Sequence, residues 1–278
     1  MIEKLKSIFI ITRPVNIVIT IISVIVAAFI SVQNYTLSFE ILLAGIAASL
    51  TAASGYIIND IFDIEIDKVN RPDRPLPIGK ISTKQAYIIS FLFGSISLII
   101  SYLVSIPALI IVIVSHFILI IYSKYLKRIP LIGNITVAFL TGLVFIYGGV
   151  VAGNPSAAVI PAVFAFLVNL IREIVKDIQD IEGDSSAGLT TFPIKFGFQK
   201  SKALILVLTI SLILYTIYPF ITQIYKIEYF IIVVIVVNPV LVYSLKVLYY
   251  QHSETSLKKT SNLLKLSMVF GLIAILLG

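Results

Sequence analysis

Long apolar runs recur along the whole chain and leave few possible folds. Nine of them approach the ~20 residues that an α-helix needs to cross the hydrocarbon core of a bilayer. They cover residues 14–32, 40–59, 85–104, 106–123, 132–152, 156–176, 202–220, 228–250 and 260–277. A transmembrane β-barrel would need short strands of alternating hydrophobicity instead. We therefore predict an all-α polytopic membrane protein with about nine transmembrane helices.

The composition excludes a soluble protein. Only 13% of the residues are charged and 59% are hydrophobic, with a mean hydropathy of +1.06. Soluble domains carry about 25% charged residues. The chain has no cysteine, which excludes disulfides, thiol nucleophiles and thiolate metal sites. We expect a single transmembrane domain over residues 1–278.

Basic residues are distributed very unevenly among the loops. Of the 21 Lys and Arg residues, only Lys226 lies in the loops that follow the first, third, fifth and seventh runs. The positive-inside rule places Lys- and Arg-rich loops in the cytoplasm. We predict a multi-pass cell-membrane protein whose N-terminus and active site face the cytoplasm. The formal net charge of +7 then reflects topology and anion binding, and no nucleic-acid partner is expected.

Two of the predicted cytoplasmic loops carry dense and similar acidic segments. The first is NDIFDIEID over residues 59–67, and the second is DIQDIEGD over residues 177–184. Each has aspartates spaced i, i+3, i+7, which would share one face of a helix. These aspartates are Asp60, Asp63 and Asp67 in the first segment, and Asp177, Asp180 and Asp184 in the second. Acids this dense at a membrane edge repel one another unless cations hold them, which indicates a functional site.

The sequences that follow the two acidic segments also match. Residues 77–80 read PIGK, and residues 193–197 read PIKFG. The interval is 117 residues at the aspartates and 116 at the proline. This degenerate internal repeat would bring two equivalent helix ends together around one pocket. We predict catalytic loops at about residues 60–84 and 177–201.

Carboxylates beside basic residues suit a complex of Mg²⁺ with a diphosphate ester. Mg²⁺ prefers oxygen ligands and binds through carboxylates plus substrate phosphates, and two ions can bridge a departing pyrophosphate. Arg suits bidentate phosphate contacts, and Lys supplies a point charge. The candidate phosphate-binding residues near the acids are Lys68, Arg71, Arg74, Lys80, Arg172 and Lys176. The alternative is that these charges only solvate helix ends. Glu65 and Glu182 are expected to face solvent.

Longer motifs resemble those of a known family. Residues 59–79 contain NDxxDxxxD and NRPxRPLPxG, which resemble the first aspartate-rich motif of the UbiA superfamily of intramembrane prenyltransferases. Residues 172–184, RExxKDxxDxxGD, resemble its second motif, and RPxN at 13–16 and YSxxxKR at 122–128 add to the likeness. The resemblance implies a UbiA-like fold around a central cavity. It also implies transfer of a polyprenyl group from its diphosphate to a membrane-embedded acceptor.

The resemblance further implies roles for individual residues. Two Mg²⁺ ions would be held by Asp60, Asp63, Asp67, Asp180 and Asp184. Asp177 would be another ligand or would orient Lys176. Phosphate oxygens would be contacted by Arg71, Lys127 and Arg128, with Arg74 and Arg172 as further candidates.

Four more residues are expected around the reacting carbon. Asn59 and Tyr122 would lie near the allylic C1, where positive charge develops as the C–O bond breaks. Arg13 and Asn16 would line the same pocket. The structural alternatives are a basic helix flank for Arg13, an interhelical hydrogen bond for Asn16 and an interfacial belt position for Tyr122.

The residues around the two motifs also indicate the acceptor. They are most similar to those of archaeal ether-lipid members, which add a second geranylgeranyl chain at the sn-2 hydroxyl of geranylgeranylglyceryl phosphate. We expect a prenyl diphosphate and a lipid-phosphate acceptor as partners, and no obligate protein partner. The alternative enzyme is an aromatic polyprenyltransferase acting on a quinone precursor such as 4-hydroxybenzoate. A secondary transporter would carry its ionisable groups near the bilayer midplane, and a non-catalytic scaffold would not need paired acidic triplets.

Overall fold

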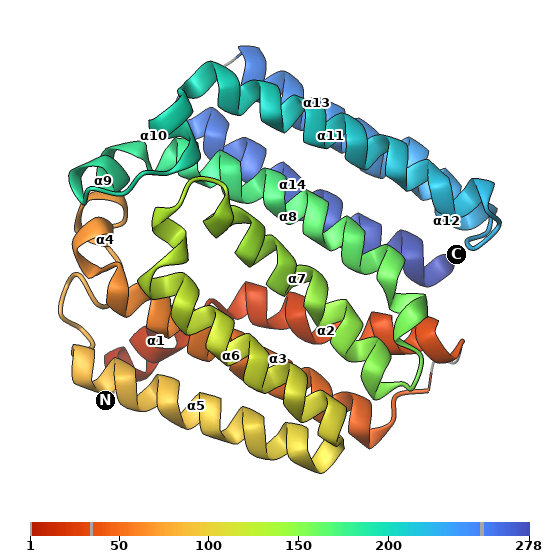
Figure 1. The fold of residues 1–278 in the computed structure, drawn as a ribbon, viewed down its shortest axis with the longest axis horizontal. Helices are drawn as coiled ribbons and strands as arrows, with labels where there is room; N and C mark the ends of the chain where they lie inside the picture. The colour runs from red at the N-terminus through yellow and green to blue at the C-terminus, as the bar shows by residue number, and fades with distance from the viewer. Residues whose placement is uncertain (1, 34–35, 251–252) are drawn as a thin grey trace. The chain divides into compact units, whose positions relative to one another are not determined.

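The computed structural model describes residues 2–33, 36–250 and 253–278. Within these ranges the chain forms helices and no strand (Figure 1). The elements are α1 (Ile2–Ile11), α2 (Pro14–Val32), α3 (Phe39–Phe62), α4 (Ile64–Asn70), α5 (Thr83–Val104), α6 (Ile106–Lys124), η1 (Leu126–Arg128), α7 (Ile132–Val151), η2 (Pro155–Ala158), α8 (Val159–Gln179), α9 (Ile181–Ser186), α10 (Phe192–Phe196), α11 (Phe198–Ile221), α12 (Ile227–Ile232), η3 (Val233–Val237), α13 (Asn238–Tyr250) and α14 (Glu254–Leu277).

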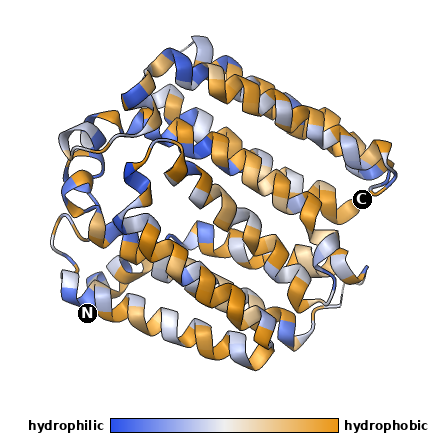
Figure 2. Cartoon of the chain, viewed as in Figure 1, coloured by the Kyte–Doolittle hydropathy of each residue, from blue (hydrophilic) through white to orange (hydrophobic). Residues whose placement is uncertain are grey.

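Nine helical segments of the described residues are long and apolar enough to cross a membrane. Their ends agree with the predicted runs to within four residues, except that the last segment begins at Glu254 instead of residue 260. Figure 2 shows that hydrophobic residues dominate these long helices. The prediction of an all-α, multi-pass membrane protein is confirmed.

The chain divides into two compact units. Unit 1 comprises residues 1–127, 144–158 and 182–189, and unit 2 comprises residues 128–143, 159–181 and 190–278. The first acidic segment lies in unit 1. The second acidic segment is divided, because Asp177 and Asp180 belong to unit 2 whereas Asp184 belongs to unit 1.

Helix α3 is the central element of unit 1 and packs against α2, α5 and α6. Small residues allow this close packing, as is common between membrane helices. A Cβ atom on Gly45 would lie 3.3 Å from the Ile21 side chain. Ser54 and Ser90 also exchange hydrogen bonds between α3 and α5, each hydroxyl donating to the other residue's carbonyl at 2.9 and 3.0 Å. These contacts hold the body of α3, whose last turn carries Asp60.

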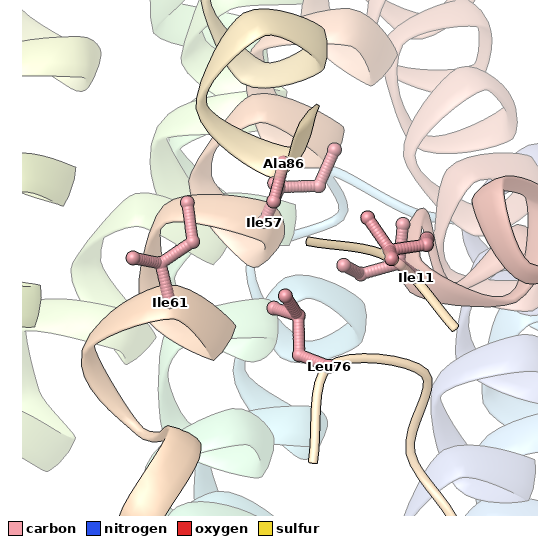
Figure 3. Close-up of a cluster of buried hydrophobic side chains, with 6 residues drawn as sticks. Ile11, Ile57, Ile61, Leu76 and Ala86 are labelled. Carbon is pink, nitrogen blue, oxygen red and sulfur yellow. The ribbon is translucent and has the colours of Figure 1, made fainter. Parts of the chain in front are cut away.

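A cluster of buried apolar side chains fixes the loop after α4. Figure 3 shows Ile11 of α1, Ile57 and Ile61 of α3, Leu76 of the loop and Ala86 of α5 gathered together. Leu76 keeps only 6% of its surface exposed. Burial of a side chain of this kind contributes about 1.5–3 kcal/mol. The loop that carries the basic residues of the first motif is thus anchored beside α3.

Helix α8 carries the second acidic segment and packs against α11 and α14 within unit 2. Gly142 of α7 lies so close to α8 that a Cβ there would be 2.8 Å from the carbonyl oxygen of Ala162. Helix α11 continues through Pro219 and ends at Ile221. Unit 2 therefore holds α8 between several neighbours, which positions its C-terminal turns.

The aspartates of each triplet do not lie on one continuous helix, as their spacing had suggested. Helix α3 ends at Phe62 and α4 starts at Ile64, so that the helix is interrupted at Asp63. The second segment is interrupted in the same way at Asp180, between α8 and α9. Asp competes with helical backbone through local hydrogen bonding, and a break also relieves repulsion between carboxylates one turn apart. The matched breaks agree with the internal repeat.

Candidate active site

Asp60 is a buried carboxylate held by two guanidinium groups. It lies in the last turn of α3 and is only 4% exposed. Its Oδ1 accepts a hydrogen bond from Arg13 Nη2 at 2.5 Å and another from Arg74 Nη1 at 3.0 Å. A buried charge needs such partners because desolvation is costly. The structure therefore brings together three residues that are more than ten positions apart in the sequence.

Arg74 links Asp60 to the third aspartate of the segment. Its Nη1 also donates to Asp67 Oδ2 at 2.6 Å, and Asp67 is 2% exposed. Burial raises the pKa of the Asp67 carboxyl above its ordinary value, and the charges of Asp60 and Asp63 raise it further, whereas Arg74 lowers it. This crowding of buried carboxylates is the electrostatic environment that an additional cation would stabilise.

Asp63, at the interruption between α3 and α4, has its own pair of contacts. Lys127 forms an ion pair with its Oδ1, and Asn59 Nδ2 donates to its Oδ2 at 2.7 Å. The Asn59 Oδ1 atom is buried and has no hydrogen-bond partner among the described residues. Buried polar atoms are nearly always satisfied. An unpartnered oxygen beside an aspartate is a place where a metal ion or another electrophile could be held.

Arg13 has an unusual backbone conformation. It precedes Pro14 and adopts φ 56° and ψ 66°, in the left-handed region. Such a conformation costs about 1–3 kcal/mol for a residue other than glycine. Its guanidinium lies 4.6 Å from the centroid of the Tyr56 ring. Although burial lowers the pKa of Arg13, the neighbouring Asp60 raises it overall, so that the cation is firmly held.

The second acidic segment in unit 2 has a different set of partners. Glu173 is 7% exposed and accepts from Arg172 at 3.2 Å and from Lys176 at 3.0 and 2.8 Å. Asp177 Oδ2 accepts from Asn134 Nδ2 of α7 at 2.8 Å. Glu173 and Asn134 were not predicted as site residues. An asparagine inside the apolar run 132–152 was a usable signal, because polar residues within membrane spans are costly.

Helix α8 also carries donors that lack a partner in the described part of the chain. They are the buried atoms Asn169 Nδ2, Arg172 Nε and Gln179 Nε2. Asn169 is 6% exposed and lies one turn before Glu173. These donors of α8 can therefore offer further hydrogen bonds to a bound group.

The other predicted residues occupy varied positions. Asn16 lies in the first turn of α2 and Tyr122 near the end of α6, and both are half-buried. Arg71 is half-buried directly after α4, and Arg128 is exposed in η1. Asp184 is 8% exposed in α9.

Two expectations about acids outside the site are confirmed. Glu65 and Glu182 are both exposed, and Glu65 pairs with Lys68 at the surface.

The chemistry of the first segment suits Mg²⁺, although the carboxylates now pair with basic side chains. No group of three or more His, Cys, Asp or Glu residues in the described ranges is arranged to hold a metal ion. Asp60, Asp63 and Asp67 nevertheless present carboxylate oxygens, and Asn59 Oδ1 adds an unpartnered amide oxygen. Mg²⁺ prefers such oxygen ligands. That these residues bind the metal stays a prediction.

The sequence matches the UbiA prenyltransferase family over residues 18–269. This chain belongs to that family. The prediction from the motifs at residues 59–79 and 172–184 is therefore confirmed.

Relatives and solved structures extend this match over the full length. The UbiA-family chain is 35% identical to digeranylgeranylglyceryl phosphate synthase from Methanosphaera stadtmanae, covering 96% of this chain and 97% of the relative. It is also similar to a solved structure of digeranylgeranylglyceryl phosphate synthase, with a TM-score of 0.75 and 35% identity. The match covers 99% of this chain and 98% of that chain. A UbiA homologue from Archaeoglobus fulgidus bound to GPP and Mg²⁺ has the same fold, with a TM-score of 0.64, 19% identity and coverage of 97% and 99%.

Proposed function

We propose that this protein transfers a geranylgeranyl group from geranylgeranyl diphosphate to the sn-2 hydroxyl of geranylgeranylglyceryl phosphate. The product carries the second ether bond of archaeal membrane lipids. The observation that carries the proposal is the full-length similarity to a relative named for this activity, at 35% identity over 96% of the chain. The buried carboxylates and guanidinium groups around Asp60 supply the chemistry that departure of a diphosphate needs.

Metal binding is assigned to the aspartates of the two segments. The proposed ligands are Asp60, Asp63, Asp67, Asp180 and Asp184 for two Mg²⁺ ions, which when bound neutralise the leaving diphosphate. Support comes from the buried oxygen atoms of the first segment and from a UbiA homologue that binds Mg²⁺ with a prenyl diphosphate. Asn59 would turn its unpartnered Oδ1 towards the ion or the allylic carbon.

The basic residues would exchange partners when substrate binds. Arg13, Arg74 and Lys127 now neutralise carboxylates, and phosphate oxygens would compete for the same donors. Arg71, Arg128, Arg172 and Lys176 are further candidates for phosphate contacts. Glu173 would keep two of these cations, Arg172 and Lys176, in place.

Three further residues complete the proposed site. Asn16 would line the pocket, Asp177 would bind metal or orient Lys176, and Tyr122 would lie near C1. The ring of Tyr122 would stabilise the positive charge that develops at C1. The C1–diphosphate bond breaks first. The acceptor hydroxyl then captures the allylic cation and forms the new C–O bond at C1, and its proton passes to the released pyrophosphate or to an aspartate. Water must be excluded because it would otherwise capture the cation.

The distribution of basic residues supports a cytoplasmic site in the cell membrane. All but one of the 21 Lys and Arg residues lie on the same predicted side as both acidic segments. The positive-inside rule assigns that side to the cytoplasm.

An acceptor competition assay tests the proposal. Purified protein in detergent receives labelled geranylgeranyl diphosphate with either geranylgeranylglyceryl phosphate or 4-hydroxybenzoate, in Mg²⁺ or in chelator. We expect Mg²⁺-dependent labelling of the glyceryl phosphate. Labelling of the benzoate alone would replace the proposed function with aromatic prenyl transfer.

A matched pair of variants tests the role of the acidic segment. Asp60→Asn should abolish turnover, whereas Glu65→Gln should leave it near the wild-type rate, because the Glu65 side chain is 78% exposed and pairs only at the surface. Near-normal activity of Asp60→Asn would refute the metal assignment.

A further inference from the structure

We propose that Asn70 is a positioning residue that holds the turn carrying Gly183 and Asp184 beside the first acidic segment, and that this contact, the clasp, requires glycine at position 183. The inference rests on the proposed function and deepens it. It concerns how Asp184 is positioned before the metal ion and the diphosphate bind. Neither Asn70 nor Gly183 was among the predicted site residues.

A hydrogen bond joins two residues that are 113 positions apart. Asn70 is the last residue of α4, three positions after Asp67, and its Oδ1 accepts from the backbone N–H of Gly183 at 3.0 Å. Gly183 lies in α9 and directly precedes Asp184. Figure 1 shows α4 and α9 next to each other. Both residues belong to unit 1, although most of the second loop belongs to unit 2.

The contact with Asn70 leaves no space for a side chain at Gly183, whose backbone conformation would itself allow one. Gly183 is buried, and it is absent from the glycines with positive φ among the described residues. A Cβ atom added to Gly183 would collide with the Cγ, Nδ2 and Oδ1 atoms of Asn70. The carboxamide therefore packs directly on the backbone of the second segment, an approach that only glycine permits.

The segment around Gly183 is folded as a unit of its own. The Gly183 carbonyl accepts from the Ser186 hydroxyl at 2.8 Å and from the Ala187 N–H at 3.1 Å. The Asp184 carbonyl accepts from the N–H of Leu189 at 2.9 Å, and Leu189 is 7% exposed. The contact between Asn70 and Gly183 therefore fixes a compact turn that carries Asp184.

The clasp completes a continuous series of contacts in unit 1. Asp60 and Asp67 share Arg74, α4 connects Asp67 to Asn70, and Asn70 holds the backbone next to Asp184. Ligands that must act together need to be held within a fraction of an ångström. We therefore assign to Asn70 the preorganisation of Asp184 relative to the first segment.

Metal dependence provides the functional test. Residues that orient metal ligands typically affect metal affinity about 10–100-fold. We expect Asn70→Ala and Gly183→Ala to raise the Mg²⁺ concentration for half-maximal activity about tenfold or more, while the rate at saturating Mg²⁺ falls much less. Glu182→Gln, at an exposed position in the same helix, should leave both values unchanged.

A double variant separates the contact from general damage. Asn70→Ala removes the carboxamide that an alanine at position 183 would strike. The double variant should therefore be more active and more stable than Gly183→Ala alone. A double variant no better than Gly183→Ala, or Mg²⁺ dependence unchanged in both single variants, would overturn the proposal.

Hydrogen exchange gives a readout that does not require turnover. In metal-free protein, the amide of Gly183 should exchange at least tenfold faster in Asn70→Ala than in wild type, because it loses its acceptor. An unchanged exchange rate over residues 182–189 would refute the clasp even if the variant were inactive. If wild type failed to prenylate geranylgeranylglyceryl phosphate, the proposed function would fail while the exchange result still tested the clasp.

Discussion

Replacing Arg74 by alanine should destabilise the metal-free protein strongly. Arg74 Nη1 contacts both Asp60 and Asp67, whose side chains are 6% and 3% exposed. Removing one partner of a buried ion pair costs about 3–5 kcal/mol, because the remaining charge stays buried. Asp60 keeps its contact with Arg13 at 2.5 Å, so that Asp67 bears most of the loss. We therefore expect the lower end of that range, about 3 kcal/mol.

The thermal unfolding temperature in detergent and chelator measures this loss. A change of 1 kcal/mol shifts the Tm of a domain of 150–250 residues by about 2–4 °C, which gives an expected decrease of roughly 6–12 °C. Lys68→Ala is the matched control, because Lys68 pairs with Glu65 at the surface, where the two side chains are 51% and 78% exposed. Such exposed pairs contribute about 0–1 kcal/mol.

The same experiment with Mg²⁺ separates the electrostatic explanation from simple loss of packing. Mg²⁺ near the Asp67 carboxylate, which loses Arg74, should restore part of the stability of Arg74→Ala, and should stabilise it more than it stabilises wild type. A Tm decrease no larger than that of Lys68→Ala would refute the reasoning. An equal Mg²⁺ effect on variant and wild type would refute the charge-based part of it.

Two further variants test other contacts. Glu173→Gln should raise the KM for the prenyl diphosphate about tenfold with a smaller effect on kcat, because Arg172 and Lys176 lose the carboxylate that orients them. Steady-state kinetics measure this change, and an unchanged KM would contradict the prediction. Gly148→Ala should lower stability by about 1–3 kcal/mol, because its Cβ would lie 2.6 Å from the carbonyl oxygen of Val24. Gly271→Ala, where nothing lies within 4 Å of the added atom, is its control in thermal unfolding.

The membrane spans could be predicted from the sequence because a bilayer imposes a strong and simple constraint. Backbone groups in hydrocarbon must be satisfied internally, so each crossing segment is a helix of fixed minimum length. The apolar runs therefore predict the positions of those segments. Only their ends needed the structure, as at Glu254, where polar residues continue the last helix beyond its apolar run.

The pairing of charges in the site could not be predicted in the same way. The spacing of Asp60, Asp63 and Asp67 indicated one helix face, but the helix breaks at Asp63. That Arg74 reaches both Asp60 and Asp67 depends on the course of the loop, which Leu76 fixes by tertiary burial. Local patterns carry no information about such contacts.

The unpredicted residues differ in how much signal the sequence held. Asn134 and Asn169 lie within apolar runs, where an amide is costly enough to attract notice. Glu173 was part of the quoted motif, but only its burial beside Arg172 and Lys176 distinguishes it from a surface acid. Asn70 was likewise part of a quoted motif, but nothing in that motif indicates its contact with Gly183, 113 positions away.

In the absence of metal, basic side chains neutralise the aspartates of the first acidic segment. Its three aspartates contact three cations, Arg13, Arg74 and Lys127. Mg²⁺ alone would have to separate these cations from largely buried carboxylates and leave them without partners, which is costly. A Mg²⁺–diphosphate complex brings both signs of charge, so that carboxylates can move to the metal while the basic side chains move to phosphate oxygens. On the proposed function, the site therefore favours the complex over either component alone, and Mg²⁺ should bind far more tightly when geranylgeranyl diphosphate is present.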